Sequence, residues 1–211
     1  MRLYGFPPSP NTWKVRAVAA HIGLPLELEF VDLSKGQQQT PEYLALNPTG
    51  RAPVLVDGDF ILWESNAIMQ YLADRTPNRL WPNDARARAD IMRWQSWQLA
   101  HWDKEGCEPL IIERLVKKFL NLGTPEMAVV AKGMESFNRE ARVLDAHLAK
   151  QSHLVGTEVT LADFSVAAPL FYAKEAELPV APYQHLRDWF ARVSALPAWR
   201  DTAPAPVSAA A

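Results

Sequence analysis

The residues best suited to chemistry lie in the first third of the chain, where polar side chains meet the start of a helix or strand. Ser9, Asn11 and Thr12 could each serve as the N-cap of the helix that follows. Unpaired backbone N–H groups and the helix dipole attract an anion to such a start. A hydroxyl there could donate a hydrogen bond to a bound thiolate and so lower the pKa of the thiol. A plain helix cap is the ordinary explanation for Ser9, and both interpretations stay open here.

Two further polar points lie on either side of a predicted hairpin. Pro53 leads into an apolar run, and an X-Pro bond is the only peptide bond with an appreciable cis population. If Ala52–Pro53 is cis and begins an edge strand, the backbone of Val54 could pair with an extended peptide. After the hairpin, Ser65 could take a ligand carboxylate while Glu64 pairs with an ammonium, which suits an α-amino-acid end. The ordinary alternatives are a proline that starts a strand and a capped helix.

The elements that position these groups follow the order βαβ and then ββα. We predict helices over 11–23, 40–46 and 64–75, and strands over 2–6, over 24–33 and on both sides of Asp57-Gly58 within 52–65. Asp-Gly is a strong hairpin signal, and Gly23 stands where a glycine ends a helix. The strands joined by the first helix should be parallel. Residues 1–75 therefore predict a small α/β domain with a four-stranded mixed sheet.

The rest of the chain has the period of helices. After a proline-containing linker, 76–84, we expect an all-α domain over 85–202 and a flexible tail over 203–211. Thr160 and Asp163 form the pattern of a capping box. Pro109 should kink or break the first long helix. The predicted helices of this domain cover 85–120, 125–150, 159–176 and 183–196.

Composition excludes several classes of protein. The chain has 211 residues, of which 48% are apolar and 22% charged, and its net charge of −2 offers no basic patch for nucleic acid or an anionic membrane. No apolar run reaches the length of a bilayer span, and the first residues lack the apolar core of a signal peptide. The single cysteine, Cys107, excludes an internal disulfide and a CxxC site. We therefore expect a cytoplasmic protein.

Four stretches occur in the order and spacing of a known family. They are SPNTWKVR (9–16), GQQQTPEYLALNPTGRAPVLVDG (36–58), LWESNAIMQYL (62–72) and LVGTEVTLADF (154–164). In them the chain resembles the cytosolic glutathione S-transferases, in particular a bacterial member of the serine-type theta, delta and phi classes. The resemblance implies a thioredoxin-like domain followed by an all-helical bundle, glutathione as co-substrate without metal or nucleotide, and a homodimer.

The resemblance also assigns roles to the polar residues. Ser9 matches the catalytic serine that hydrogen-bonds the glutathione thiolate. Asn11 is the second candidate, because some bacterial relatives with disulfide-reducing activity use an asparagine at this site. Tyr4, on the first predicted strand, is a third candidate, whereas Cys107 is expected to be buried and inert.

Seven residues are implied to bind glutathione. Pro53 matches the cis-proline of the family, Val54 would exchange backbone hydrogen bonds with the cysteinyl unit, and the pair at 64–65 would hold the γ-glutamyl end. Phi-type members carry a His-Lys pair where this chain has two glutamines, so glycine-end recognition should rely on Arg51. The implied binding residues are Gln38, Gln39, Arg51, Ala52, Val54, Glu64 and Ser65.

A run of tryptophans lies in the first helix of the predicted all-α domain. Trp94, Trp97, Gln98 and His101 have the spacing of one helix face, and Trp102 borders it. They could form core packing and a dimer seam. By resemblance, Trp97, His101 and Trp102 could instead wall a pocket for an apolar or aromatic electrophile.

The function expected from the resemblance is activation of the glutathione thiolate for attack on an electrophile. A glutathione-dependent disulfide-bond reductase or peroxidase would use the same groove, with more of the work done by Asn11. A glutathione-dependent isomerase or dehalogenase would differ mainly in the electrophile pocket. A non-catalytic binding module of the same fold is the alternative from another class.

Overall fold

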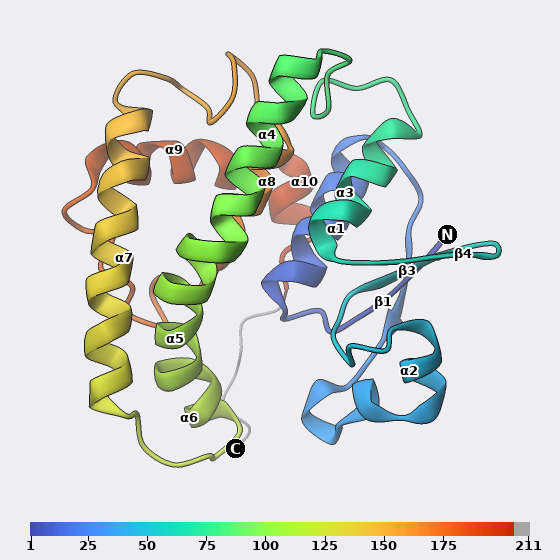
Figure 1. Cartoon of the computed structure of the whole chain (residues 1–211), viewed down its shortest axis with the longest axis horizontal. Coiled ribbons are helices and arrows are strands. Elements are labelled where there is room, and N and C mark those ends of the chain that lie inside the picture. Colours follow the sequence, from blue (N-terminus) through green and yellow to red (C-terminus); the bar gives the residue numbers. More distant parts are fainter. Residues whose placement is uncertain (205–211) are drawn as a thin grey trace. The chain divides into compact units, whose positions relative to one another are not determined.

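The computed structural model describes residues 1–204, which form two units (Figure 1). The first contains Met1–Trp81 together with the segment that begins at Leu196, and the second spans Pro82–Ala195. The segment 196–204 thus groups with the α/β unit, whereas the sequence analysis assigned 85–202 to the helical domain. The predicted flexible tail, 203–211, lies almost entirely outside the described residues.

A four-stranded mixed sheet forms the centre of the first unit, as predicted. Its strands are β1 (Arg2–Gly5), β2 (Glu27–Phe30), β3 (Val54–Asp57) and β4 (Phe60–Trp63), in the order β2-β1-β3-β4. The β1–β2 pair is parallel and the other two pairs are antiparallel. Gly58, at φ +64°, makes the turn between β3 and β4, in agreement with the Asp-Gly signal. The prediction of an edge strand after Pro53 was wrong, because β3 lies between β1 and β4.

Helices cover both faces of this sheet (Figure 1). On one face lie α1 (Pro10–His21) and α3 (Ser65–Asp74), and on the other lies α2 (Pro41–Leu46). The hydroxyl of Thr40 accepts the backbone N–H of Tyr43 at 3.4 Å, so Thr40 caps α2. The segment before α2 contains two short 3₁₀ turns, η1 (Leu33–Lys35) and η2 (Gln37–Gln39).

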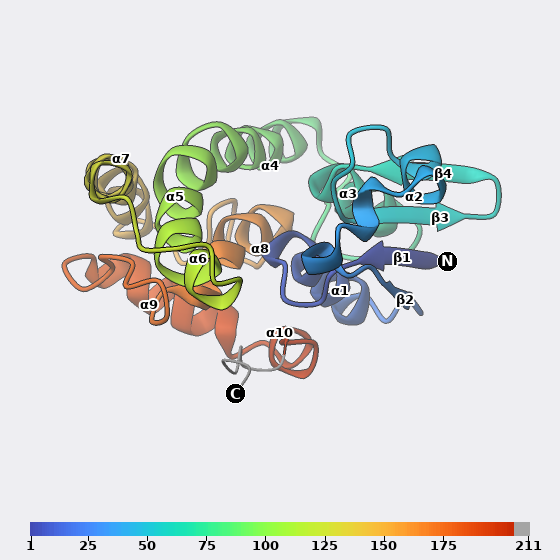
Figure 2. The same ribbon diagram turned by 90° about the horizontal axis from the view of Figure 1, so that it is seen from below.

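The C-terminal helix α10 (Pro197–Asp201) packs on α1 (Figure 2). The rings of Trp13 and Trp199 have their centroids 4.1 Å apart, and Trp13 Nε1 donates to Thr202 Oγ1 at 3.1 Å. Trp13, which makes this contact, is fully buried, so α1 is covered by α10 as well as by the sheet and α3.

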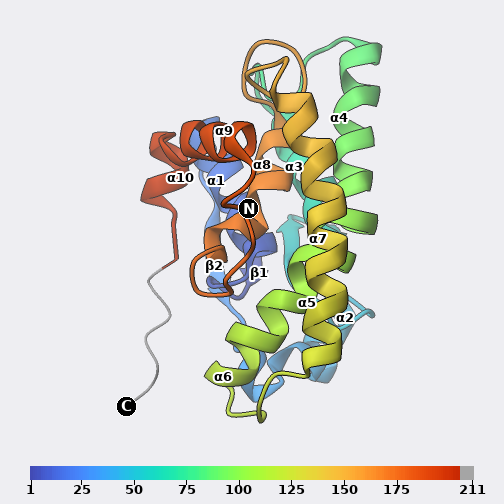
Figure 3. The same cartoon turned by 90° about the vertical axis from the view of Figure 1, so that its left-hand side faces the viewer.

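The second unit begins with one long, uneven helical rod that lies beside α7 (Met127–Leu148) (Figure 3). A kink or break was expected at Pro109; the chain stays helical through this residue, so there is no break. A π-helical stretch precedes this proline instead, and its wider turns accommodate a residue that lacks an N–H. The rod consists of α4 (Ala85–Trp97), the π segment η3 (Gln98–Cys107), α5 (Glu108–Ile111), the π turn η4 (Ile112–Val116) and α6 (Lys117–Phe119).

Asp163 ties the remaining helices of the second unit together. It is fully buried in α8 (Leu161–Ala167), and its carboxylate accepts the backbone N–H groups of Thr160 at 2.8 Å and Leu154 at 3.0 Å. It also accepts Nε1 of Trp189, in α9 (Gln184–Ser194), at 2.8 Å. The capping box is therefore confirmed as a structural feature. Helix α8 is shorter than predicted because the chain continues as a 3₁₀ turn, η5 (Ala168–Tyr172), that contains Pro169.

No helix within residues 1–204 is long and apolar enough to cross a membrane.

Candidate functional site

Ser9 occupies the N-cap position of α1 without using its hydroxyl as a cap. Its backbone is extended, at φ −68° and ψ 126°, and its carbonyl accepts the N–H of Trp13 at 2.9 Å. The side chain makes no capping hydrogen bond. Proline at position 10, the first of the helix, has no N–H and removes one of the donors that a cap would satisfy. The Ser9 hydroxyl is therefore available to a ligand at the start of α1.

A side-chain hydrogen bond joins the starts of α1 and α3. Ser65 Oγ donates to Asn11 Oδ1 at 3.1 Å, with Ser65 buried and Asn11 half-buried. Because the oxygen of the Asn11 amide accepts this bond, its N–H₂ group remains as a donor. The structure thus places Asn11, at the start of α1, and Ser65, at the start of α3, side by side.

Glu64 has a strained backbone at the junction of β4 and α3. Its φ is +72° and its ψ is 109°, a conformation that L residues rarely adopt, and its side chain is exposed. Such strain costs about 1–3 kcal/mol and is concentrated at ligand sites. The carboxylate of Glu64 does not cap α3, and Glu64 directly precedes Ser65, which bonds Asn11.

The Ala52–Pro53 peptide bond is cis. Pro53 and Val54 are buried, and Val54 is the first residue of β3, opposite Tyr4 of β1 and Trp63 of β4. Ala52 packs against the apolar cluster that contains Val54. The backbone at 52–54 is therefore held firmly at the start of an inner strand.

Two side chains that the sequence analysis did not single out hold the loop before Pro53. Tyr43 Oη and Asn47 Nδ2 both donate to the carbonyl of Arg51, at 2.9 Å and 2.7 Å. Burial raises the pKa of Tyr43 to about 12, so its hydroxyl remains a donor throughout the neutral range. The sequence signal for Asn47 is the stretch NPTG (47–50), which is typical of a turn.

The two glutamines predicted at the glycine end behave differently. Gln39 Nε2 donates to the carbonyl of Gly50 at 3.3 Å. Gly50 has φ +62°, a conformation that glycine adopts without strain, and a Cβ there would lie 2.5 Å from Gln39 Nε2, so the Gln39 side chain would have to move. Gln38 Oε1 is buried without a hydrogen-bond partner within residues 1–204, and the side chain of Arg51 is exposed.

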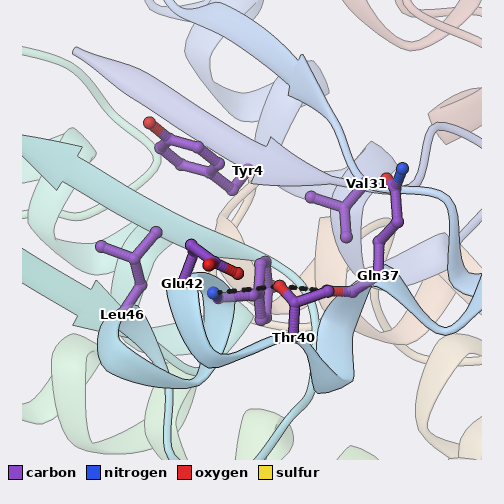
Figure 4. A pocket seen from close by; sticks show the side chains of 7 residues that line it. Tyr4, Val31, Gln37, Thr40, Glu42 and Leu46 are labelled. Carbon is purple, nitrogen blue, oxygen red and sulfur yellow. Dashed lines mark hydrogen bonds between the residues drawn. The ribbon is translucent and has the colours of Figure 1, made fainter.

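Tyr4 lies away from the other candidates for contact with sulfur. It lines a pocket of about 480 Å³ between the sheet and α2, on the face opposite α1 (Figure 4). Neither Ser9 nor Asn11 lines this pocket. Its lining residues are Tyr4, Val31, Gln37, Thr40, Glu42, Tyr43 and Leu46.

The tryptophan run in the second unit is mainly core. Trp102 is fully buried, stacks on Trp97 with centroids 5.7 Å apart, and donates its Nε1 to the carbonyl of Val166 at 3.0 Å. It therefore has no surface for a co-substrate, and its assignment to an electrophile pocket is corrected. The prediction assumed α-helical spacing, whereas the helix is π from Gln98. The wider turns shift which positions are buried, so Trp102 is buried and His101 is exposed.

Trp97 is half-buried, and its Nε1 donates to Glu140 Oε2 at 2.9 Å. It therefore keeps some surface on which a ligand could lie.

The remaining chemical group of interest, the Cys107 thiol, is fully buried. Desolvation, followed by the charge of Asp103, raises its pKa well above the ordinary value, so the thiolate is disfavoured. The prediction that Cys107 is buried is confirmed. In the part of the chain that the structure describes, no group of three His, Cys, Asp or Glu side chains is placed to hold a metal ion.

Comparison with known families assigns both units. The family model described as the glutathione S-transferase N-terminal domain matches residues 1–74, and the one described as the C-terminal domain matches residues 107–197. The chain belongs to the glutathione S-transferase family. It is an enzyme of this family, and its fold is the thioredoxin-like domain followed by an all-helical domain that the sequence analysis expected.

Relatives cover nearly the whole chain. Glutathione S-transferase 3 of Zea mays is 38% identical over 208 residues, which is 96% of this chain and 92% of that protein. Glutathione S-transferase theta-2B of Homo sapiens is 34% identical over 180 residues, covering 84% of this chain and 70% of that protein. The bacterial origin expected from the sequence stays a prediction.

Solved structures agree with these relatives. The structure of glutathione S-transferase III in its apo form is 38% identical, covers 95% of this chain and 94% of its own, and has a TM-score of 0.83. Glutathione transferase F7 of Populus trichocarpa, 25% identical, covers 95% and 96% of the two chains with a TM-score of 0.87.

Proposed function

We propose that this glutathione S-transferase binds glutathione across the starts of α1, β3 and α3 and activates it as the thiolate. The observation that carries the proposal is the hydroxyl of Ser9, which stands at the start of α1 and caps nothing. A helix start favours an anion, and a hydroxyl there can donate to it. Similarity to proteins named glutathione S-transferases supports glutathione as the thiol.

The proposed pose places each charged end of glutathione against an opposite charge or a donor. The γ-glutamyl carboxylate lies at Ser65 and the first N–H groups of α3, and its ammonium faces Glu64. The cysteinyl unit runs along the backbone of Val54 after the cis peptide bond. The glycine carboxylate meets Arg51 and the amides of Gln38 and Gln39, of which Gln39 bonds the carbonyl of Gly50, the residue before Arg51.

The proposed chemistry needs no covalent bond between enzyme and substrate. The thiol of glutathione loses its proton because the hydrogen bond from Ser9 and the start of α1 stabilise the thiolate. The thiolate then attacks an electrophile, which we propose to be apolar or aromatic. Of the three residues predicted to contact it, Trp97 and His101 retain exposed surface.

A glutathione-dependent disulfide-bond reductase is the second candidate. The Asn11 amide, with its oxygen bonded to Ser65, keeps N–H groups that could donate to sulfur. In that case Asn11, rather than Ser9, would make the principal contact with the thiolate.

We also propose that the protein acts as a homodimer in the cytoplasm. Strand β4 is the last strand of the sheet and exposes the apolar side chains of Phe60, Ile61 and Trp63, 43%, 41% and 39% accessible. An exposed apolar edge strand favours association with another chain. These side chains are the part of the first unit that we expect a second copy to cover.

Replacing Ser9 by alanine tests the proposal. Because one hydrogen bond to a charged group contributes about 1.5–3 kcal/mol, the pKa of bound thiol should rise by about one to two units toward its free value near 8.5. Glutathione affinity measured with the thiol protonated should change little. The titration follows thiolate absorbance in the ultraviolet, on wild type and Ser9→Ala with saturating glutathione.

Asn11→Ala is the matched comparison for this titration. A larger rise in the thiol pKa in Asn11→Ala than in Ser9→Ala would transfer the principal role to Asn11. No rise in either variant would contradict the proposed site.

A further inference from the structure

Lys14 is a fully buried lysine close to the proposed glutathione site. Its relative accessibility is 0%, although lysine is almost never fully buried unless it is paired. It follows Asn11 by three residues in α1, and such residues lie on the same side of a helix. Lys14 therefore lies about one turn further along α1, on the same side as Asn11, the residue that bonds Ser65.

The ammonium of Lys14 bonds the residue next to Ser65. Its Nζ donates to Asn66 Oδ1 at 2.8 Å, and Asn66 is itself only 7% accessible. The bonds that join the starts of α1 and α3 include the one between Asn11 and Ser65 at 3.1 Å and the interior one between Lys14 and Asn66. A charge-assisted bond is the stronger type of link between two elements.

Packing alone does not explain a lysine at this position. Burial of an ammonium costs several kcal/mol unless hydrogen bonds compensate it, and a methionine of similar length would fill the space without that cost. The bond to Asn66 gives the charge a specific consequence, because it fixes the first turn of α3 relative to the first turn of α1.

We propose that Lys14 is a positioning residue for the γ-glutamyl end of glutathione, acting through Asn66 on Ser65. Lys14 does not touch glutathione; it holds α3 so that Ser65 stays at the distance from Asn11 that the ligand requires. This inference rests on the proposed glutathione site and deepens it. It adds a buried charge, which acts indirectly, to the two residues proposed to bind the γ-glutamyl end, Glu64 and Ser65.

Lys14→Met tests the inference, with two thiols as probes. Glutathione carries the γ-glutamyl group, whereas cysteinylglycine lacks it. In the variant, KM for glutathione should rise about tenfold, the equivalent of one lost hydrogen bond, while KM for cysteinylglycine and kcat at saturating glutathione change little. A merely structural role would weaken both thiols alike, and that result would overturn the inference.

Arg75→Met is the control for loss of one positive charge in the same unit. Arg75 follows α3 at its far end, where it pairs with Asp57 at 3.5 Å and its side chain is 50% accessible. Its substitution should leave the ratio of the two KM values at the wild-type level. An equal change in Arg75→Met would overturn the role of Lys14, because net charge would then explain the effect.

Two variants of the partner keep the test decisive if Lys14→Met does not fold. Asn66→Asp retains an acceptor for the ammonium and should keep the preference for glutathione, whereas Asn66→Ala removes the acceptor and should lose it. Equal preference in the two would overturn the inference. If wild type and these variants bind glutathione equally well, only the positioning role is refuted. If wild type does not bind glutathione, the proposed function itself is refuted.

Discussion

Glu64 shows at the scale of one residue how strain and ligand binding coincide. Its positive φ of 72° costs free energy that the folded structure must offset, and its exposed carboxylate is the proposed partner of the γ-glutamyl ammonium. Glycine adopts positive φ without the Cβ clash, while alanine does not. Substitution by these two residues therefore separates the backbone effect from the loss of the carboxylate.

We predict that Glu64→Gly is more stable than Glu64→Ala by about 1 kcal/mol, since glycine relieves the strain at some cost in chain entropy. Both variants should weaken glutathione binding about tenfold or more, because each removes the same charge. Urea unfolding and calorimetric titration measure the two effects. Unchanged affinity in both variants would refute the γ-glutamyl assignment, and equal stability would show that residue 64 stores no strain.

Individual residues were predictable from sequence where a local rule applied. Ser9, Pro53 and Ser65 could be found because helix starts and X-Pro bonds have sequence signals. The bond between Asn11 and Ser65, 54 positions apart, and the buried contact of Lys14 with Asn66 could not, because both depend on how α1 and α3 pack. The full burial of Trp102 was missed because α-helical spacing was assumed where the helix is π.

At the scale of elements, Glu113 fixes the start of α7 to the helical rod. Glu113 Oε2 accepts the backbone N–H of Glu126, the N-cap residue of α7, at 2.7 Å. Lys117 Nζ lies 2.8 Å from the same oxygen and 3.0 Å from Glu126 Oε1. The Lys117 hydrogen bond, followed by that of the Glu126 N–H, lowers the pKa of Glu113 below the ordinary 4.5. The ionised carboxylate thus stabilises this junction.

The stability that Glu113 contributes should depend on pH in one direction. A lowered folded-state pKa means that the contribution is complete above the ordinary value of 4.5 and is lost as pH falls through the lower folded value. Wild type should therefore exceed Glu113→Gln in free energy of unfolding at neutral pH, and the difference should shrink below pH 4.5. Urea unfolding at several pH values measures it.

Glu108→Gln is the control for this measurement. Its partner Lys104 lies 3.3 Å away, with the same spacing of four residues, but both side chains are exposed. An exposed pair contributes little, so the control should lie near wild type at every pH. A difference for Glu113→Gln that stays constant through acid pH would contradict the proposed role of its charge.

Elements were predicted well where periodicity or turn chemistry was strong. The four strands and α1 to α3 follow from alternation, the Asp-Gly turn and helix caps. The rod from α4 to α6 was found as one helical region, but its π segments have no sequence period that distinguishes them from α-helix. Helix α10 was missed because it has only five residues, too few for a periodic pattern.

At the scale of the whole molecule, the chain begins and, within residues 1–204, ends in the same unit. The sequence analysis divided the chain by composition into a mixed half and a helical half, and the matched family domains cover residues 1–74 and 107–197. Composition could not show that 196–204 packs with the first unit, because this depends on the contact of Trp199 with Trp13. Helix α10 therefore supports α1, the helix that follows Ser9.

The most direct test of the central claim is a crystal structure of the protein with bound glutathione. We predict that the sulfur lies within hydrogen-bonding distance of Ser9 Oγ, with the γ-glutamyl end at Glu64 and Ser65 and the cysteinyl backbone along Val54. Glutathione in the pocket between the sheet and α2, or a sulfur atom that faces no donor at the start of α1, would contradict the account.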